Sequence, residues 1–292
     1  MRFSSIDFAQ LAPPSAVDPL DYETIYAERQ DRFLEIWDDA RAIDPTLPSF
    51  DAIGLESDPV AMLLQESAYR ELILRQLVND RTLSVLLPYA QGGGIDLLGA
   101  NFGVARAEAE DDTRFRRRVQ LAPEALASAG TEGGYIFHAL TAAPLVLDAK
   151  PESTRPGRVR VTIMGAGESR LPTEADTLAV RSRLAHPDVK PLTDMVSVAP
   201  PQIVPLVVSA TVMVPAGPDL AVVRARVDAA LAEYLTSRNR LGALIARSGI
   251  VGALHQPGVV TVDLTSPAAD LVLAANEAWR LDGVNVTYGV AS

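Results

Sequence analysis

Residues of the types that perform catalysis are few in this chain, and they are widely spaced. The 292 residues include three histidines and no cysteine, which excludes thiolate nucleophiles, thiolate metal ligands and disulfides. His138, His186 and His255 lie far apart in the sequence and form no two-histidine helical zinc motif. We expect structural roles for all three, with His138 buried because it follows Phe137 on a short predicted helix. We predict no metal site and no cofactor.

Two glycine clusters could be mistaken for phosphate-binding loops. Gly92-Gly93-Gly94 follows a predicted helix, whereas a dinucleotide-binding fingerprint follows a strand and has a third, spaced glycine. Residues 165–169 follow a predicted strand but lead to Pro172 instead of a helix, and they include no lysine. Both clusters are predicted to be turns, and the chain is predicted not to be an enzyme.

The only dense basic run is Arg114-Phe115-Arg116-Arg117-Arg118. On a helix its arginines point in three directions while Phe115 faces the core. The run is interpreted as a solvated face or as ion pairs to a partner protein, with nucleic-acid binding as a third alternative. Because the chain has 26 basic and 37 acidic residues and a net charge of -11, we expect no nucleic acid among its partners.

No membrane segment is predicted. The longest uncharged stretch, residues 195–218, contains five prolines, and a helix in lipid could not satisfy the hydrogen bonds that they remove. The first residues reach Asp7 before an apolar run develops, so we expect no secretory signal and a protein that stays in the cytosol where it is made.

The N-terminal half is predicted to be helical. Residues 22–41 carry an apolar stripe that includes Tyr26, Phe33 and Trp37. A second helix begins at Asp58-Pro59, an N-cap acid followed by a proline that the first turn tolerates, and is expected to reach about Pro88. Further helices are expected over residues 95–103 and from Asp112 to Pro123.

The second helix is apolar on most of its sides. Leu64, Ala68 and Leu72 form one row, Tyr69, Ile73 and Leu77 an adjacent row, and Leu63, Leu74 and Val78 lie beyond both. A helix of this kind needs neighbours on most sides, and the first eighty or so residues supply only one other good helix. We predict that partner chains cover the rest, although the later domains could instead fold back over it. The predicted interface residues are Tyr26, Phe33, Trp37, Leu64, Tyr69, Leu72, Ile73 and Leu77.

After about residue 145 the apolar period changes from 3.6 to 2. Strands are expected over residues 158–164, 206–214, 259–264 and 284–288, and helices over 173–185 and 219–235. The fold class is therefore α+β: a helical N-terminal half with a long bundle helix, followed by two small α+β modules. The predicted domains are 1–90 for the inter-chain bundle, 91–195 for a helical linker and the first module, and 196–292 for a module that makes ring contacts.

An internal similarity links the two predicted α+β modules. Apolar residues at 136, 137, 139, 140, 145 and 146 match those at 250, 251, 253, 254, 259 and 260, each in a predicted short helix that leads to a strand. Tandem related modules are one explanation, and coincidence among common residues is the other.

Six segments carry a resemblance to a known family: residues 69–76, 94–106, 114–124, 134–140, 190–194 and 247–259. In order and in residue type they resemble the baseplate J-like family of contractile-tailed phages and related particles. The resemblance implies a structural wedge protein with no catalytic residues. It also implies a heterotrimer of two copies of this chain and one related wedge protein, joined through N-terminal helices.

The same resemblance implies neighbours and a location. Neighbouring wedges would meet through the C-terminal modules in a sixfold ring around the tail hub, near the sheath, in a virion assembled in the host cytoplasm. Two other functions remain open from the residues alone. One is a soluble protein-binding adaptor that uses a strand edge such as 206–214, and the other is a hydrolase built from His186, Asp188 and Asp194.

Overall fold

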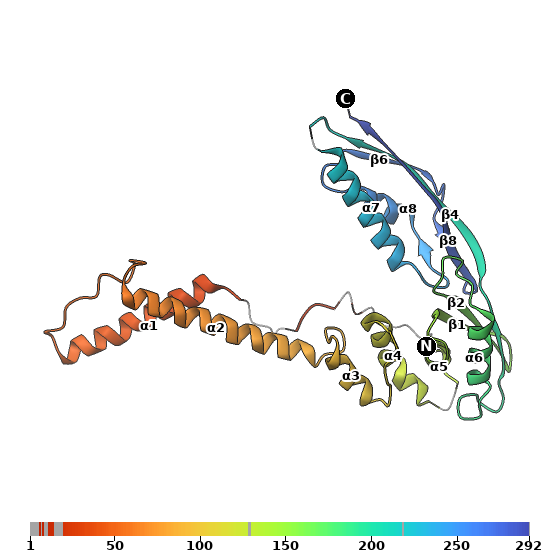
Figure 1. Cartoon of the computed structure of the whole chain (residues 1–292), viewed down its shortest axis with the longest axis horizontal. Helices are drawn as coiled ribbons and strands as arrows, with labels where there is room; N and C mark the ends of the chain where they lie inside the picture. Colours follow the sequence, from red (N-terminus) through yellow and green to blue (C-terminus); the bar gives the residue numbers. More distant parts are fainter. Residues whose placement is uncertain are drawn as a thin grey trace. The chain divides into compact units, whose positions relative to one another are not determined.

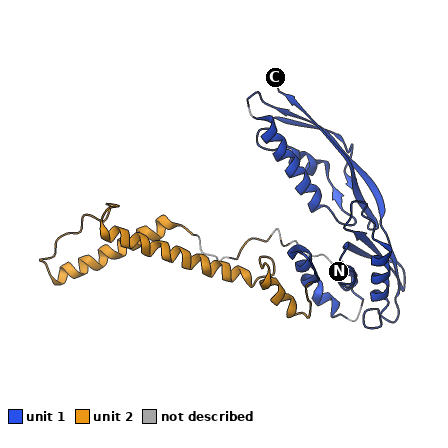
Figure 2. Ribbon diagram, viewed as in Figure 1, with its two compact units in different colours: residues 1–3, 107–292 blue, residues 4–106 orange. Residues whose placement is uncertain are grey.

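The computed structural model describes residues 6, 8, 11–14, 20–127, 130–217 and 219–291. They fall into two compact units, one that ends at Arg106 and one that begins at Ala107 (Figure 2). This boundary lies inside the predicted segment 91–195. The assignment of 1–90, 91–195 and 196–292 to separate roles stays a prediction.

The first unit is helical (Figure 1). It consists of α1 (Tyr22–Ile43), α2 (Pro59–Ser84) and α3 (Gly93–Ala100). As the sequence predicts, Asp58 caps α2, and its carboxylate accepts hydrogen bonds from the backbone of Val60 and Ala61. The helix ends before the expected Pro88, because the chain turns at Leu86, whose amide bonds the carbonyl of Leu83.

Small side chains allow α1 and α2 to pack closely. Ala61 and Ala68 of α2 are fully buried, as is Ile25 of α1. Between the helices, Arg29 of α1 pairs with Glu71 of α2, which also pairs with Arg75. These two guanidinium groups lower the pKa of the Glu71 carboxyl. The hairpin is therefore held by one small-residue face and one ion-pair cluster.

The second unit starts with a first module of three helices and one sheet. Its elements are α4 (Asp112–Ala125), α5 (Glu132–Ala142), β1 (Val146–Arg155), β2 (Arg158–Gly165), α6 (Glu174–Leu184) and β3 (Met195–Ala199). The strand order is β1-β2-β3, with β1 antiparallel and β3 parallel to β2. Leu140, Ile163 and Leu184 join its core. The predicted end of α4 at Pro123 is wrong by two residues, because a proline in the last turn removes only one helical hydrogen bond.

A second module follows, built around the long strand β4. It contains β4 (Gln202–Val214), α7 (Leu220–Ser237), β5 (Leu244–Ile245), α8 (Arg247–Leu254), β6 (Thr261–Ser266), β7 (Leu271–Val272) and β8 (Glu277–Val290). The strand order is β6-β4-β8, with β6 antiparallel and β8 parallel to β4, and β5 pairs with β7. Alternate residues of β4 are buried with Val227 and Leu231 of α7.

The two modules share a local arrangement, and the α+β fold class is confirmed. In each, a helix (α5 or α8) leads into the edge strand (β1 or β6) that runs antiparallel to the central strand. The matched residues Ile136 and Ile250 are both buried, as are Leu140 and Leu254. The central strand follows this edge strand in the first module and precedes it in the second. The similarity predicted from sequence is therefore local.

Candidate interaction surfaces

The residues proposed for a hydrolase do not form a catalytic arrangement. His186 and Asp188 are both exposed on one turn, with Nδ1 and Oδ2 3.4 Å apart. Asp194 accepts a hydrogen bond of 2.7 Å from the Tyr135 hydroxyl, and burial together with this bond raises the pKa of Tyr135. Asp194 thus anchors a loop to α5. Across the described ranges, no group of three or more His, Cys, Asp or Glu residues could hold a metal ion.

His138 is buried, as predicted. Its Nδ1 lies 3.4 Å from a guanidinium nitrogen of Arg183 on α6. Burial, and to a smaller extent the charge of Arg183, lower the pKa of His138 to about 4. The imidazole is therefore neutral at physiological pH and joins α5 to α6.

In the part of the chain that the structure covers, no helix is long and apolar enough to cross a membrane.

The basic run of α4 binds its own chain, so the interpretation as a solvated or partner-binding face is wrong for Arg114, Arg117 and Arg118. Arg114 donates to the carbonyls of Leu140, Ala143 and Val146, at the end of α5 and the start of β1. A guanidinium suits these positions because the last carbonyls of a helix lack partners and carry partial negative charge. The sequence could not reveal this, since the acceptors are main-chain atoms of another helix.

Two buried carboxylates complete this internal network. Glu110 accepts from Arg118 at 2.6 Å, and Arg118 is only 5% exposed. Asp148 of β1 pairs with Arg117, and its other carboxylate oxygen accepts a hydrogen bond of 2.8 Å from the amide of Leu241 in the second module. Asp148 thus links β1, on which it lies, to α4 and to the second module.

The helix α2 carries a broad exposed apolar face. Of its residues, only Ala61, Ala68 and Asn79 are buried. The predicted interface residues Tyr69, Ile73 and Leu77 are 54%, 47% and 48% exposed. Four more apolar residues of α2 are at least as exposed as Leu77, and the predicted interface omitted them: Met62, Leu63, Leu74 and Val78. We call these seven residues the α2 face.

The other predicted interface residues have neighbours within the chain. Leu64 and Leu72 are half-buried and lie one helical turn on either side of the fully buried Ala68. Phe33 and Trp37 of α1 pack edge-on against Phe50, with ring centroids 5.0 and 5.9 Å apart, and the Trp37 indole donates to the Pro48 carbonyl.

Tyr26 stacks on Tyr22, with ring centroids 6.0 Å apart. The α1 aromatics are therefore partly covered by their own chain. The covering residue Phe50 lies in a loop, where helical periodicity gives no signal.

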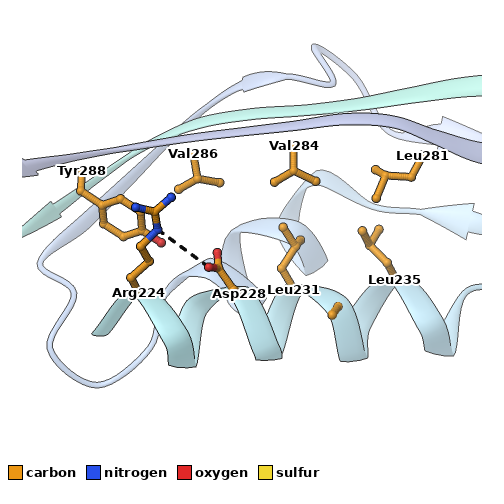
Figure 3. Close-up of a pocket in the computed structure, with 9 residues that line it drawn as sticks. Arg224, Asp228, Leu231, Leu235, Leu281, Val284, Val286 and Tyr288 are labelled. Atoms are coloured by element: carbon orange, nitrogen blue, oxygen red, sulfur yellow. Dashed lines mark ion pairs between the residues drawn. The ribbon is translucent and has the colours of Figure 1, made fainter. Parts of the chain in front are cut away.

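A groove lies between α7 and β8 in the second module (Figure 3). Its volume is about 380 Å³. The β8 side is formed by Leu281, Val284, Val286 and Tyr288, and the α7 side includes Arg224, Asp228, Leu231 and Leu235. The sequence analysis identified both elements but not the groove, because it depends on how far α7 covers the sheet.

Comparisons with known proteins match both units. The model of the Baseplate J-like N-terminal domain matches residues 56–112, which include α2, and that of the Baseplate J-like protein C-terminal domain matches residues 207–287. Baseplate protein J of Escherichia phage P2 is 36% identical over 290 residues, which are 94% of each chain.

A weaker structural likeness is to a chain in a cryo-EM structure of the anti-feeding prophage baseplate, 6-fold symmetrised. It covers 61% of this chain and 43% of that one, with 14% identity and a TM-score of 0.42. The conclusion rests on the sequence matches, which extend over both units and nearly the full length of the phage P2 protein. The chain belongs to the baseplate J-like family.

Proposed function

We propose that this chain is a structural subunit of the baseplate wedge in a contractile phage tail or tail-like particle. In this role it joins wedges around the central hub and relays the rearrangement that starts sheath contraction. Family membership supports a structural role in the baseplate. The single observation that carries the proposal is the exposed α2 face.

The α2 face is suited to a helical bundle with other chains. Complete burial of a large apolar side chain contributes about 1.5 to 3 kcal/mol. Because Tyr69, Ile73 and Leu77 are about half exposed, their further burial would contribute on the order of 1 kcal/mol each. Seven such residues on one helix would supply a large part of the free energy that association requires. We propose that the partners at this face are a second copy of this chain and one related wedge protein.

The remaining partners follow from the same proposal. The C-terminal modules would contact neighbouring wedges in a sixfold ring, and the ring would surround the tail hub in the virion. We include no nucleic acid among the partners, because the densest basic run is bound within its own chain and the net charge is -11.

Aspartate at one position of the α2 face tests this proposal. We expect Ile73→Asp to abolish co-elution with the other baseplate chains in size-exclusion chromatography, because a carboxylate would be buried among apolar side chains. Ile43→Asp is the matched control: Ile43 is 87% exposed at the end of α1 and lies outside the face. The proposal fails if Ile73→Asp assembles as well as Ile43→Asp while both chains remain folded by circular dichroism.

A further inference from the structure

The strand β8 is a sheet edge along almost its whole length. It pairs with β4 at thirteen positions from Glu277 to Val290, and no other strand among the described residues pairs with its second side. The carbonyl of Glu277 accepts a hydrogen bond from Gly242, but this contact is at the very start of the strand. The backbone donors and acceptors beyond it are available to another strand.

The second half of this edge lacks the features that normally block strand pairing. Residues 284–290 read Val-Asn-Val-Thr-Tyr-Gly-Val, without charge and without proline. The edge strand β1, in contrast, carries Lys150, Pro151 and Glu152. Natural sheets use charges and prolines of this kind to prevent edge-to-edge association. The free edge of β8 therefore has the composition of a strand that pairs.

The face of β8 that points toward α7 is incompletely covered. In the groove described above, Leu281 and Val284 are 40% and 43% exposed. The Tyr288 hydroxyl is buried, and none of the described residues bonds it. Figure 3 shows α7 running alongside β8, with Arg224 beside Tyr288 and Leu235 near Leu281. A second helix on this side would cover the apolar residues that α7 leaves open.

The charges on α7 match those of a second copy related by a twofold axis. Arg224 and Asp228 are one turn apart, 64% and 57% exposed, and their charged atoms are 3.9 Å apart, so their mutual pairing is weak. If two β8 strands pair antiparallel about a twofold axis near Val286, both α7 helices lie on the same face of the joined sheet. Arg224 of each copy then lies opposite Asp228 of the other.

We propose that β8 pairs antiparallel with β8 of a second copy of this chain, which joins two three-stranded sheets into one and closes the α7–β8 groove with the second α7. This contact deepens the proposed function, since it names the partner of the C-terminal module. It uses residues remote in sequence from the α2 face, so the two can fail separately.

Charge variants on α7 test the self-complementary geometry. The full chain carries Ile73→Asp throughout, which removes the α2 contact from the readout. Sedimentation velocity should show a concentration-dependent dimer that either Arg224→Asp or Asp228→Arg weakens, because each variant places two like charges opposite each other. An equimolar mixture of these two variants should dimerise again, since both cross-contacts then pair opposite charges. Arg32→Asp, at an equally exposed ion pair on α1, is the control and should change nothing.

Cysteine cross-linking tests the strand pairing directly, because the chain has no cysteine of its own. In the same background, the residue on the twofold axis lies opposite its own copy, so one of Asn285→Cys, Val286→Cys and Thr287→Cys should form a disulfide-linked dimer under mild oxidation. Asp263→Cys on the other edge strand, β6, should not. The inference is overturned if none of Asn285→Cys, Val286→Cys and Thr287→Cys cross-links, or if the charge-variant mixture behaves like each variant alone. Neither result would bear on the α2 face.

Discussion

Buried charged side chains in the first module connect its helices and strands through hydrogen bonds and ion pairs. Arg114, Arg118 and Asp148 each join segments distant in sequence, and each has its charge or hydrogen-bonding capacity met by an internal partner. Such groups are costly to leave unpaired in a protein interior. The basic run that suggests an external contact in the sequence is therefore a requirement of the fold. A run of arginines identifies the charge but not its partners.

The buried His138 makes this module sensitive to acid. Its pKa is lowered to about 4 in the fold, against about 6.5 in an unfolded chain. Between these values the unfolded chain binds the proton more readily, so the free energy of unfolding is unaffected above pH 6.5 and falls as the pH drops from 6.5 to 4. The loss is about 3 kcal/mol.

Urea unfolding of the wild type and of His138→Gln over this pH range measures the effect. The variant should lose less stability on acidification than the wild type by about that amount, whereas His186→Gln, at an exposed histidine, should behave like the wild type. Parallel pH profiles for the wild type and His138→Gln would contradict this account of His138.

At the scale of elements, local patterns predict helices and strands well when the signal lies within the element. The Asp58-Pro59 start of α2 and the alternation in β2 and β4 are of this kind. Signals that come from another element are lost. Phe50 covers Phe33 and Trp37 from a loop, and the groove beside β8 depends on the placement of α7.

The contact between α7 and α8 gives a prediction at this scale. A Cβ atom at Gly249 would lie 2.3 Å from the Tyr234 hydroxyl and 2.5 Å from the ring, whereas one at Gly252 on the same helix would meet nothing within 4 Å. Gly249→Ala should therefore lower the free energy of unfolding by about 1 to 3 kcal/mol through overpacking. Gly252→Ala should be neutral or stabilising by up to about 1 kcal/mol. Equal effects of the two substitutions in denaturant unfolding would show that Tyr234 does not restrict this contact.

At the scale of the whole molecule, the two units differ in how completely they bury their apolar residues. The modules after Ala107 contain continuous cores, while α2 buries little beyond its alanines and leaves seven large apolar side chains exposed. The need for cover could be predicted from sequence, since apolar residues occur around α2 and the first eighty or so residues supply only one other good helix. Which residues α1 covers could not, because the small side chains of Ala61 and Ala68 determine the packed face.

Protection of the α2 face on assembly tests the central claim most directly. A single cysteine introduced as Leu74→Cys, at a position 61% exposed, should react rapidly with a maleimide in the isolated chain and become largely unreactive in purified baseplates. A cysteine introduced as Ile43→Cys should remain reactive in both states. Equal reactivity of the Leu74→Cys thiol in the isolated chain and in the baseplate would contradict the claim that other subunits cover α2.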